Sequence, residues 1–362
     1  MRLFALWLVL CLALSGCQVS GEIENQAYVL ILGAERLEDG RVGLTARVPK
    51  IGKSAGGGDK GDSGGSPYLT FSVSGDSWLD ALEALELATP RPVNLSHIEM
   101  IVVSDALASE AGFPALLGAM TDTPHLYATA RFVICRGSAR AFIEAGETVI
   151  GTRMSAELRA MLRHYADEGY IPDRSLADAC FSTRAPYSDP VAIWAMLERD
   201  DAASEGAGAV LSSPMRQRYC GAALMRGGRF VGALTLPESR LLNLILGGTR
   251  TLPYSLDGLP CAPKAAAKPT LGVDIDGAGN VALRVTMRLC DTEGLSQEEK
   301  AKLCEELQRG IAALIGRCQA LDCDPFGFSE QAATRFLTIR EFVDSGWRAG
   351  YVRASVEVSV NA

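Results

Sequence analysis

The segments 281-VALRVTMRLC-290 and 296-SQEEKAKLCEELQRGIAALIGRCQA-320 decide the fold of the C-terminal part of the chain. In the first segment apolar residues alternate with polar or small ones, which is typical of a strand that covers a core with one face. In the second, Ser296 and Glu299 form the capping box of a helix with one apolar stripe. A second alternating run, from Val352 to Val360, closes the chain. We therefore predict an α+β domain in which an antiparallel sheet is backed by one long helix.

Upstream of this domain, helix and strand patterns alternate. Residues 27–48 predict a β-hairpin around Asp39-Gly40, and Ser77 caps a predicted helix that ends at Ala88. Further apolar runs predict three strands and two helices, which together indicate a mixed α/β domain. The strands are 97–103, 128–135 and 191–197, and the helices are 138–145 and 155–167.

Changes in composition give the predicted domain boundaries. A hairpin around Gly227-Gly228 and a helix from Glu238 predict a small middle domain, and the Pro-, Ala- and Lys-rich run after it predicts a linker. Two runs rich in Gly, Ser and Asp, at 52–66 and 200–209, predict exposed loops. We thus expect an α+β protein with three folded domains. The bounds are 27–200 for the N-terminal mixed α/β domain, 207–252 for the middle domain, 253–269 for the linker and 270–362 for the C-terminal domain.

The N-terminal residues predict export and a lipid anchor. Arg2 precedes an apolar run that is too short to span a bilayer as a helix, so residues 1–16 are typical of a secretory signal peptide. The run Leu14-Ser15-Gly16-Cys17 resembles the lipobox of bacterial lipoproteins, in which the cysteine is joined to diacylglycerol. We therefore expect lipidation at Cys17 and a lipid-anchored segment over 17–26. The alternative is an ordinary signal peptide followed by a chance cysteine.

Composition and motifs narrow the class of protein. A chain of 362 residues, 48% of them hydrophobic, is long enough to bury a sizeable core. Its net charge of -8 offers no basic surface for phosphates, which argues against a nucleic-acid partner. The histidines His97, His125 and His164 have no metal-ligand spacing, and no nucleophile elbow or dinucleotide-binding motif occurs. The sequence therefore predicts no catalytic residue, no cofactor and no metal.

Eight cysteines remain when Cys11 and Cys17 are set aside with the signal and the anchor. An even number in an exported protein would permit disulfides. Cys304 and Cys318 fall on the predicted long helix, about 21 Å apart at about 1.5 Å per residue, whereas a bridge requires Cα atoms within about 7 Å. Both also fall on the apolar stripe of that helix, so we interpret them as small buried hydrophobic residues.

Several short motifs occur in a fixed order along the chain. They are Glu22-Ile23-Glu24-Asn25-Gln26-Ala27-Tyr28-Val29, Asn94-Leu95-Ser96-His97-Ile98-Glu99, Gly232-Ala233-Leu234, Pro237-Glu238-Ser239-Arg240, Cys318-Gln319, Asp324-Pro325-Phe326-Gly327-Phe328 and Trp347. In this order, beside a lipobox, they resemble the Ger(x)C family of spore-germination lipoproteins, the C subunits of nutrient germinant receptors. The resemblance covers the whole mature chain. Val19 and the many cysteines depart from the family pattern.

The resemblance implies a fold, partners and a location. The family fold is three mixed α/β domains without known catalysis. Family members are held by lipid on the outer face of the spore inner membrane, beside an A subunit and a multi-helix B subunit. The resemblance therefore implies a non-catalytic subunit that contacts the A and B membrane subunits to trigger germination. It does not identify the germinant.

The motifs supply candidate residues for structural or partner contacts. The run Asp324-Pro325-Phe326-Gly327 is typical of a helix-terminating turn in which Gly327 permits positive φ and a phenylalanine packs on the core, with partner contact as the alternative. His97 falls in a predicted apolar strand, where core or interface packing is favoured over ligand binding. The full set is Ser96, His97, Gly232, Glu238, Gln319, Asp324, Pro325, Phe326, Gly327 and Trp347.

Two other classes of function remain open at the level of sequence. A solute-binding lipoprotein of a transporter would share the anchor, but such proteins usually have two similar lobes around a cleft, whereas the halves of this chain differ in pattern. A lipid-anchored hydrolase is the second alternative, since a catalytic set can assemble from residues far apart in sequence.

Overall fold

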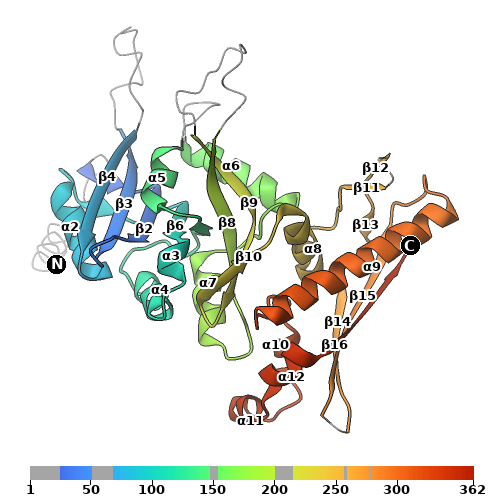
Figure 1. Ribbon diagram of the computed structural model, residues 1–362. Helices are drawn as coiled ribbons and strands as arrows, with labels where there is room; N and C mark the ends of the chain where they lie inside the picture. The colour runs from blue at the N-terminus through green and yellow to red at the C-terminus, as the bar shows by residue number, and fades with distance from the viewer. Residues whose placement is uncertain (1–24, 51–67, 147–153, 200–214, 257–258, 278) are drawn as a thin grey trace, which may run out of the picture.

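The computed structural model describes residues 25–50, 68–146, 154–199, 215–256, 259–277 and 279–362. The predicted signal peptide, lipidated Cys17 and the loops at 52–66 and 200–209 lie outside these ranges. Figure 1 shows two bodies, each built around a β-sheet, with the N-terminal body in blue to yellow and the C-terminal body in orange to red. The protein is an α+β protein, as predicted.

The N-terminal body is built on an eight-stranded sheet with the order β10-β9-β8-β7-β6-β2-β3-β4. Its four central strands are parallel to one another, and each edge carries two antiparallel strands. The central strands are β2 (Ile31–Arg36), β6 (Met100–Ser104), β7 (Arg131–Cys135) and β8 (Val191–Arg199). The outer strands are β3 (Val42–Pro49), β4 (Tyr68–Gly75), β9 (Met215–Arg226) and β10 (Arg229–Ala233). A small parallel pair, β1 (Ala27–Tyr28) and β5 (Val93–Asn94), lies apart from this sheet.

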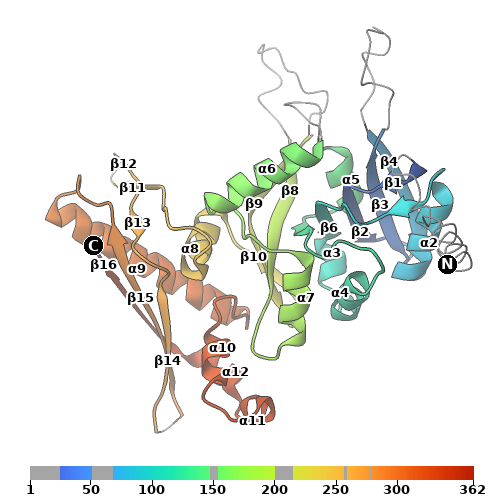
Figure 2. The ribbon, with the colours of Figure 1, turned by 180° about the vertical axis from the view of Figure 1, so that it is seen from behind.

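Helices cover both faces of this sheet, which is why β6 is buried along its whole length. Four helices pack on one face and two on the other, α6 lying across the sheet in Figure 2. The first group is α2 (Trp78–Ala88), α3 (Asp105–Ala108), α4 (Phe113–Thr121) and α7 (Leu176–Arg184), and the second is α5 (Ala139–Glu144) and α6 (Met154–Asp167). The predicted capping role of Ser77 is confirmed, because Ser77 and Asp80 form a complete capping box at the start of α2.

The predicted middle domain over 207–252 is not a separate domain. Its hairpin exists, as β9 and β10 around Gly227-Gly228, but β9 pairs antiparallel with β8 from Val191↔Leu224 to Arg199↔Met215. The hairpin therefore covers the edge that β8 would otherwise leave unpaired. Helix α8 (Leu236–Leu246) follows, ends at Gly247 in the left-handed conformation and contacts both β9 and the C-terminal body. Alternating hydrophobicity marks a strand but does not reveal its neighbour, which is why the sequence suggested a separate unit.

The C-terminal body is a four-stranded sheet backed by the predicted long helix. Helix α9 (Gln297–Ala320) begins at the Ser296/Glu299 capping box and buries Leu307, Ile311 and Leu314 against strand β15 (Val281–Cys290) and its neighbours. Strand β14 (Thr270–Ile275) pairs antiparallel with β15, as expected. Strand β16 (Ser355–Asn361), however, is parallel to β15. The purely antiparallel prediction was wrong because α9 returns the chain to the end of the sheet where β15 starts.

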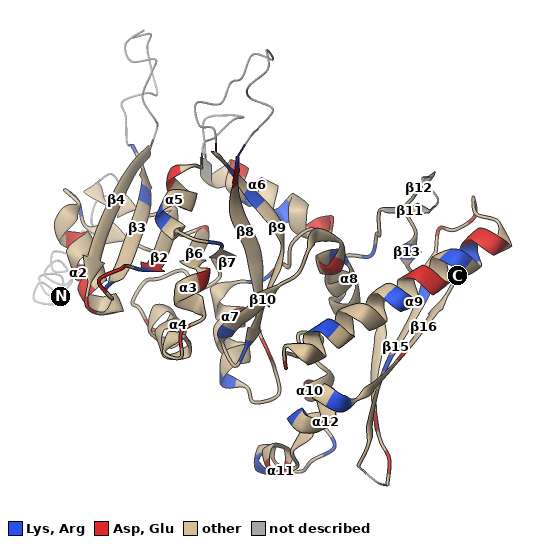
Figure 3. Cartoon of the chain, viewed as in Figure 1, with Lys and Arg blue, Asp and Glu red and all other residues tan. Residues whose placement is uncertain are grey.

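Two predicted boundaries in this body also change. The run 253–269 is more than a linker: it holds β11 (Tyr254–Leu256), β12 (Leu259–Cys261) and β13 (Lys264–Ala265), and β13 pairs antiparallel with β15. Val352 belongs to helix α12 (Trp347–Arg353), so the last strand begins only at Ser355. Short helices α10 (Phe328–Ala333) and α11 (Ile339–Asp344) precede α12. Figure 3 shows acidic and basic residues interspersed along α9.

Candidate functional site

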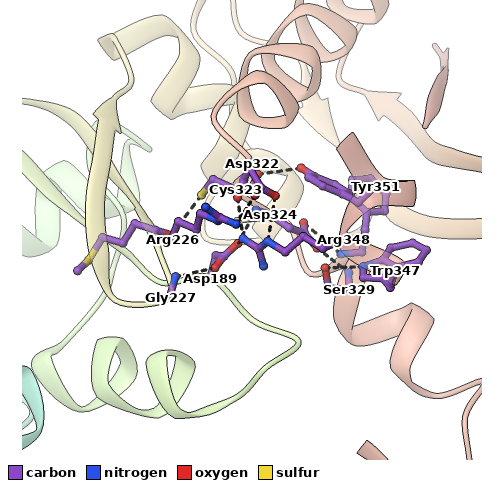
Figure 4. A network of polar contacts seen from close by, with 12 residues as sticks. Asp189, Arg226, Gly227, Asp322, Cys323, Asp324, Ser329, Trp347, Arg348 and Tyr351 are labelled. Atoms are coloured by element: carbon purple, nitrogen blue, oxygen red, sulfur yellow. Dashed lines mark hydrogen bonds and ion pairs between the residues drawn. The ribbon is translucent and has the colours of Figure 1, made fainter. Parts of the chain in front are cut away.

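Eight of the ten candidate residues gather where the C-terminal body meets the β9–β10 hairpin and helix α8. We call this region the interdomain junction and define it as Asp189, residues 226–238, residues 317–329 and helix α12 (Figure 4). The candidates within it are Gly232, Glu238, Gln319, Asp324, Pro325, Phe326, Gly327 and Trp347. Ser96 and His97 lie elsewhere, before strand β6.

The Asp189 carboxylate connects three segments of the junction. Its side chain is 2% exposed, in the loop between α7 and β8. One oxygen accepts the backbone N–H of Gly227 at 3.0 Å, and the other accepts the backbone N–H of Asp324 at 2.9 Å and Nη2 of Arg348 at 2.5 Å. A buried carboxylate is costly unless such donors surround it. Asp189 therefore fixes the hairpin turn, the 324 turn and α12 relative to one another.

Arg348 extends this network to the end of helix α9. Its Nε donates to Asp322 Oδ1 at 3.0 Å, and its Nη2 donates to the Asp322 carbonyl at 2.6 Å. Arg226, on strand β9, forms an ion pair with the same Asp322 carboxylate. Burial lowers the pKa of the Arg348 guanidinium, but the charges of Asp189 and Asp322 more than offset this, so its pKa is raised. Arg348 is thus charged, and it connects Asp189 of the N-terminal body with Asp322 of the C-terminal body.

Asp324 organises the turn that carries the predicted motif. Its Oδ1 accepts the backbone N–H groups of Phe326, Gly327 and Phe328 at 3.2, 3.2 and 3.3 Å, and its Oδ2 accepts that of Ser329 at 2.5 Å. Gly327 adopts a φ of +94°, and the rings of Phe326 and Phe328 are buried 5.8 Å apart. Burial raises the pKa of the Asp324 carboxyl despite these donors. The positive φ of Gly327 and the buried phenylalanines expected from the sequence are present, but the turn does not end a helix, because α9 ends at Ala320 and Gly327 is the N-cap of α10. The sequence also did not reveal that Asp324 is buried.

Hydrogen bonds also attach helix α12 to the end of α9. Gln319 Nε2 donates to the carbonyls of Tyr351 and Ala354 at 2.8 and 3.0 Å, and the Tyr351 hydroxyl donates to the Cys323 carbonyl at 2.8 Å. Trp347 Nε1 donates to Ser329 Oγ at 2.8 Å. Because these donors and acceptors are buried, each bond is costly to lose.

A second contact between the bodies joins helices α8 and α9. Glu238 pairs with Arg317 at 2.5 Å and also accepts the backbone N–H of Thr235 at 2.8 Å, while Arg317 donates to the Ala233 carbonyl at 2.7 Å. Burial raises the pKa of Glu238, but the bonds from Arg317 and Thr235 outweigh it, so the pKa is lowered. Gly232 lies close to this contact, where an added Cβ would be 3.0 Å from Leu321 Cδ1.

The structure corrects the prediction for His97. The residue is exposed and precedes β6, because Asn94 Oδ1 accepts the backbone N–H and hydroxyl of Ser96 in a turn and the strand starts only at Met100. Ser96 Oγ lies 2.9 Å from His97 Nδ1, and the His97 ring stands edge-on to Tyr28 with centroids 4.9 Å apart. His97 is therefore not a core residue.

Sequence reasoning missed Asp189, Arg226, Asp322 and Arg348 as junction residues. Asp322 follows the end of α9 and has a left-handed φ of +49°. Asp189 and Arg348 are 159 residues apart and carry no local motif, so only the folded chain brings them together.

The part of the chain that the structure describes offers few groups for covalent or metal chemistry. Within it, no group of three or more His, Cys, Asp and Glu side chains could hold a metal ion. The eight cysteines other than Cys11 and Cys17 lie within it as free thiols, and burial raises the pKa of Cys318 to about 12, which keeps its thiol protonated and unreactive. In the same ranges, no helix combines the length and apolar content needed to cross a membrane.

Comparison with known proteins agrees with this architecture. Residues 20–194 match the family model "Spore germination protein N-terminal domain", and residues 261–362 match "Spore germination B3/ GerAC like, C-terminal". The crystal structure of the GerBC protein has a TM-score of 0.52 at 14% identity and covers 91% of this chain and 96% of its own, which shows a shared fold. The two family models and the two-body fold define the class as a spore germination protein.

The family follows from the same matches. Spore germination protein KC of Bacillus subtilis (strain 168) is 23% identical over 97% of this chain and 91% of its own length. Putative spore germination protein YfkR of the same organism is 27% identical over 37% of this chain, an alignment that spans only 35% of that relative. The chain belongs to the Ger(x)C family, the C subunits of germinant receptors.

Proposed function

We propose that the protein is a lipid-anchored, non-catalytic C subunit of a spore nutrient germinant receptor. It acts through contacts with the A and B membrane subunits on the outer face of the spore inner membrane. The observation that carries the proposal is the interdomain junction, because one buried carboxylate, Asp189, holds segments from both bodies of a chain in the germinant-receptor family.

A junction of this kind is suited to transmitting force between partners. Coupling between two contact surfaces requires that the element between them move as a unit or switch between defined arrangements. The ion pairs of Asp189 with Arg348 and of Glu238 with Arg317 join the two bodies at separate points. Two such points restrict rotation of one body against the other more than one point does. A partner bound to the N-terminal body would therefore be mechanically connected to a partner bound to the C-terminal body.

A lipid anchor at Cys17, as the sequence predicts, would serve the same function. Two or more acyl chains on Cys17 would hold the subunit at the membrane without a spanning helix. The distance is short, since the eight Cα-to-Cα steps from Cys17 to Asn25 reach at most about 28 Å when the chain is fully extended. The N-terminal body would thus lie within contact range of membrane subunits.

Replacement of the lipidated cysteine tests this proposal. Cys17→Ala should leave the circular dichroism spectrum and unfolding midpoint unchanged, release the protein from membranes that lack the A and B subunits, and weaken germination. Cys11→Ala is the matched control. Retention of unlipidated Cys17→Ala protein on such membranes would contradict the anchor. Tight nutrient binding by the isolated protein together with no association with the A and B subunits would favour a solute-binding lipoprotein, and turnover of a peptidoglycan or ester substrate would favour a hydrolase.

A further inference from the structure

A separate cleft lies in the N-terminal body, at the amino ends of strands β6 and β7. Its volume is about 770 Å³, within the range of about 300–1,000 Å³ that small-molecule sites occupy. Helix α6 forms one wall, the Ser96–Glu99 turn forms another, and the first turn of α7 closes one end. None of the residues of the interdomain junction lines it, so this cleft is independent of the function proposed above.

Three arginine side chains line the cleft, and two of them are neutralised. Arg131 forms an ion pair with Asp173, and Arg159 Nε donates to Glu99 at 3.1 Å. Arg163, one helical turn beyond Arg159 on α6, makes no ion pair with any residue in the described ranges. Arg163 is therefore the one arginine of the cleft without an ion-pair partner among the described residues.

The remaining acid of the cleft is already committed to the backbone. Asp178 Oδ2 accepts the backbone N–H and the hydroxyl of Ser175 at 2.9 and 2.7 Å in the capping box of α7. Burial lowers the pKa of Arg131, Asp178 raises it, and the positive charge of Arg163 lowers it again. The charge of Asp178 therefore more than offsets that of Arg163 at the Arg131 guanidinium. A ligand with one negative charge can pair with Arg163, whereas a dianion would bring surplus negative charge towards Asp178.

The cleft also presents an aromatic surface. Tyr127 is 52% exposed, although a ring of this size normally buries most of its area. The buried apolar side chains of Ile98 and Leu162 also line the cleft. A ligand that suits these surroundings has one anionic group and an apolar body.

We propose that this cleft binds a small organic monocarboxylate, with the carboxylate on the guanidinium of Arg163 and the apolar body against Tyr127. The guanidinium fork matches a carboxylate with two parallel hydrogen bonds, which gives orientation as well as attraction. His97 and Ser96 at the rim add polar groups for a substituent on the ligand.

The test uses the purified full-length protein in detergent and benzoate as the probe, titrated by isothermal calorimetry. We expect saturable binding of benzoate, at least 10-fold weaker binding of neutral benzamide, and at least 10-fold weaker binding of benzoate by Arg163→Gln. Arg163→Lys, which keeps the charge but loses the fork, should bind with intermediate affinity. Arg140→Gln is the matched control, because Arg140 is exposed on α5 and pairs only with Glu144.

Tyr127→Ala separates the two parts of the site. It should weaken benzoate binding by a larger factor than acetate binding, because only benzoate has a ring to place against Tyr127. The proposal is overturned if benzoate shows no saturable binding, if Arg163→Gln binds benzoate as the wild type does while its unfolding midpoint is unchanged, or if benzamide binds equally well. Preferential binding of inorganic phosphate over benzoate would also overturn it, by showing a phosphate site instead.

Discussion

Arg348→Met is the sharpest perturbation of the interdomain junction. Methionine keeps much of the apolar stem but removes the charge that faces the Asp189 carboxylate, whose side chain is only 2% exposed. Asp189 retains two backbone N–H donors, from Gly227 and Asp324, but has no remaining cation at hydrogen-bond distance within the described residues. The substitution therefore leaves a buried, uncompensated charge.

The magnitude follows from the burial of the two partners. Removal of one partner of a fully buried pair costs about 3–5 kcal/mol. Because the side chain of Arg348 is 34% exposed, water partly replaces it, and we expect a loss of about 2–4 kcal/mol in the free energy of unfolding. The double substitution Asp189→Asn/Arg348→Met removes both charges and should be less destabilised than Arg348→Met alone by at least about 1 kcal/mol.

Urea unfolding followed by tryptophan fluorescence measures these differences, and the shape of the transition adds information. Loss of the junction should allow the two bodies to unfold separately, which would lower the apparent m-value. Arg340→Met is the matched control, since its pair with Asp344 has side chains 92% and 70% exposed and should contribute about 0.5 kcal/mol or less. If Arg348→Met were as stable as Arg340→Met, the buried carboxylate would not hold the bodies together and the reasoning would be wrong.

Three further predictions concern the same region. Because the pKa of Glu238 is lowered in the folded protein, its contribution to stability is present above the ordinary value of 4.5 and is lost as pH falls through the folded pKa. Glu238→Gln should therefore reduce the loss of unfolding free energy at acid pH, and an unchanged loss would refute this. Gly327→Ala should cost about 1–2 kcal/mol in the free energy of unfolding, because φ at this position is +94°. Gly316→Ala is the control: this position lies in the interior of α9 with open space at its Cβ, so the substitution should be neutral or stabilising by up to about 1 kcal/mol. Equal thermal midpoints for the two variants would count against the strained turn. Gln319→Leu removes one hydrogen bond from each of two buried carbonyls, although the Tyr351 carbonyl keeps the backbone N–H of Ala354 at 3.1 Å. The substitution should cost about 1–2 kcal/mol in urea unfolding, and a loss below about 0.5 kcal/mol would show that water replaces the lost donor.

Elements encoded by neighbouring residues were predictable from the sequence. The capping boxes of α2 and α9, the hairpin turn at Gly40 and the helix end at Gly247 depend on side chains within a few positions of one another. The turn that follows Asp324 was predictable for the same reason. Each of these features is stabilised mainly by contacts that a short window of sequence contains.

Elements that depend on pairing between distant segments were not predictable. Nothing in the alternation of β16 shows that it lies parallel to β15, and nothing in β9 shows that it extends the sheet from β8. Asp189 and Arg348 look like ordinary surface residues in the sequence, since burial and partnership arise only when α12 packs against the loop before β8. The family motifs marked Glu238 and Asp324 in the junction but not Asp189, Asp322 or Arg348.

Co-purification from spore inner membranes tests the central claim most directly. Affinity-tagged full-length protein should recover both the A and the B subunit after mild detergent extraction. The Asp189→Asn/Arg348→Met protein should remain in the membrane fraction but recover less of at least one partner and support a weaker germination response. Recovery of neither subunit by the wild-type protein, under conditions in which the A and B subunits recover each other, would contradict the account.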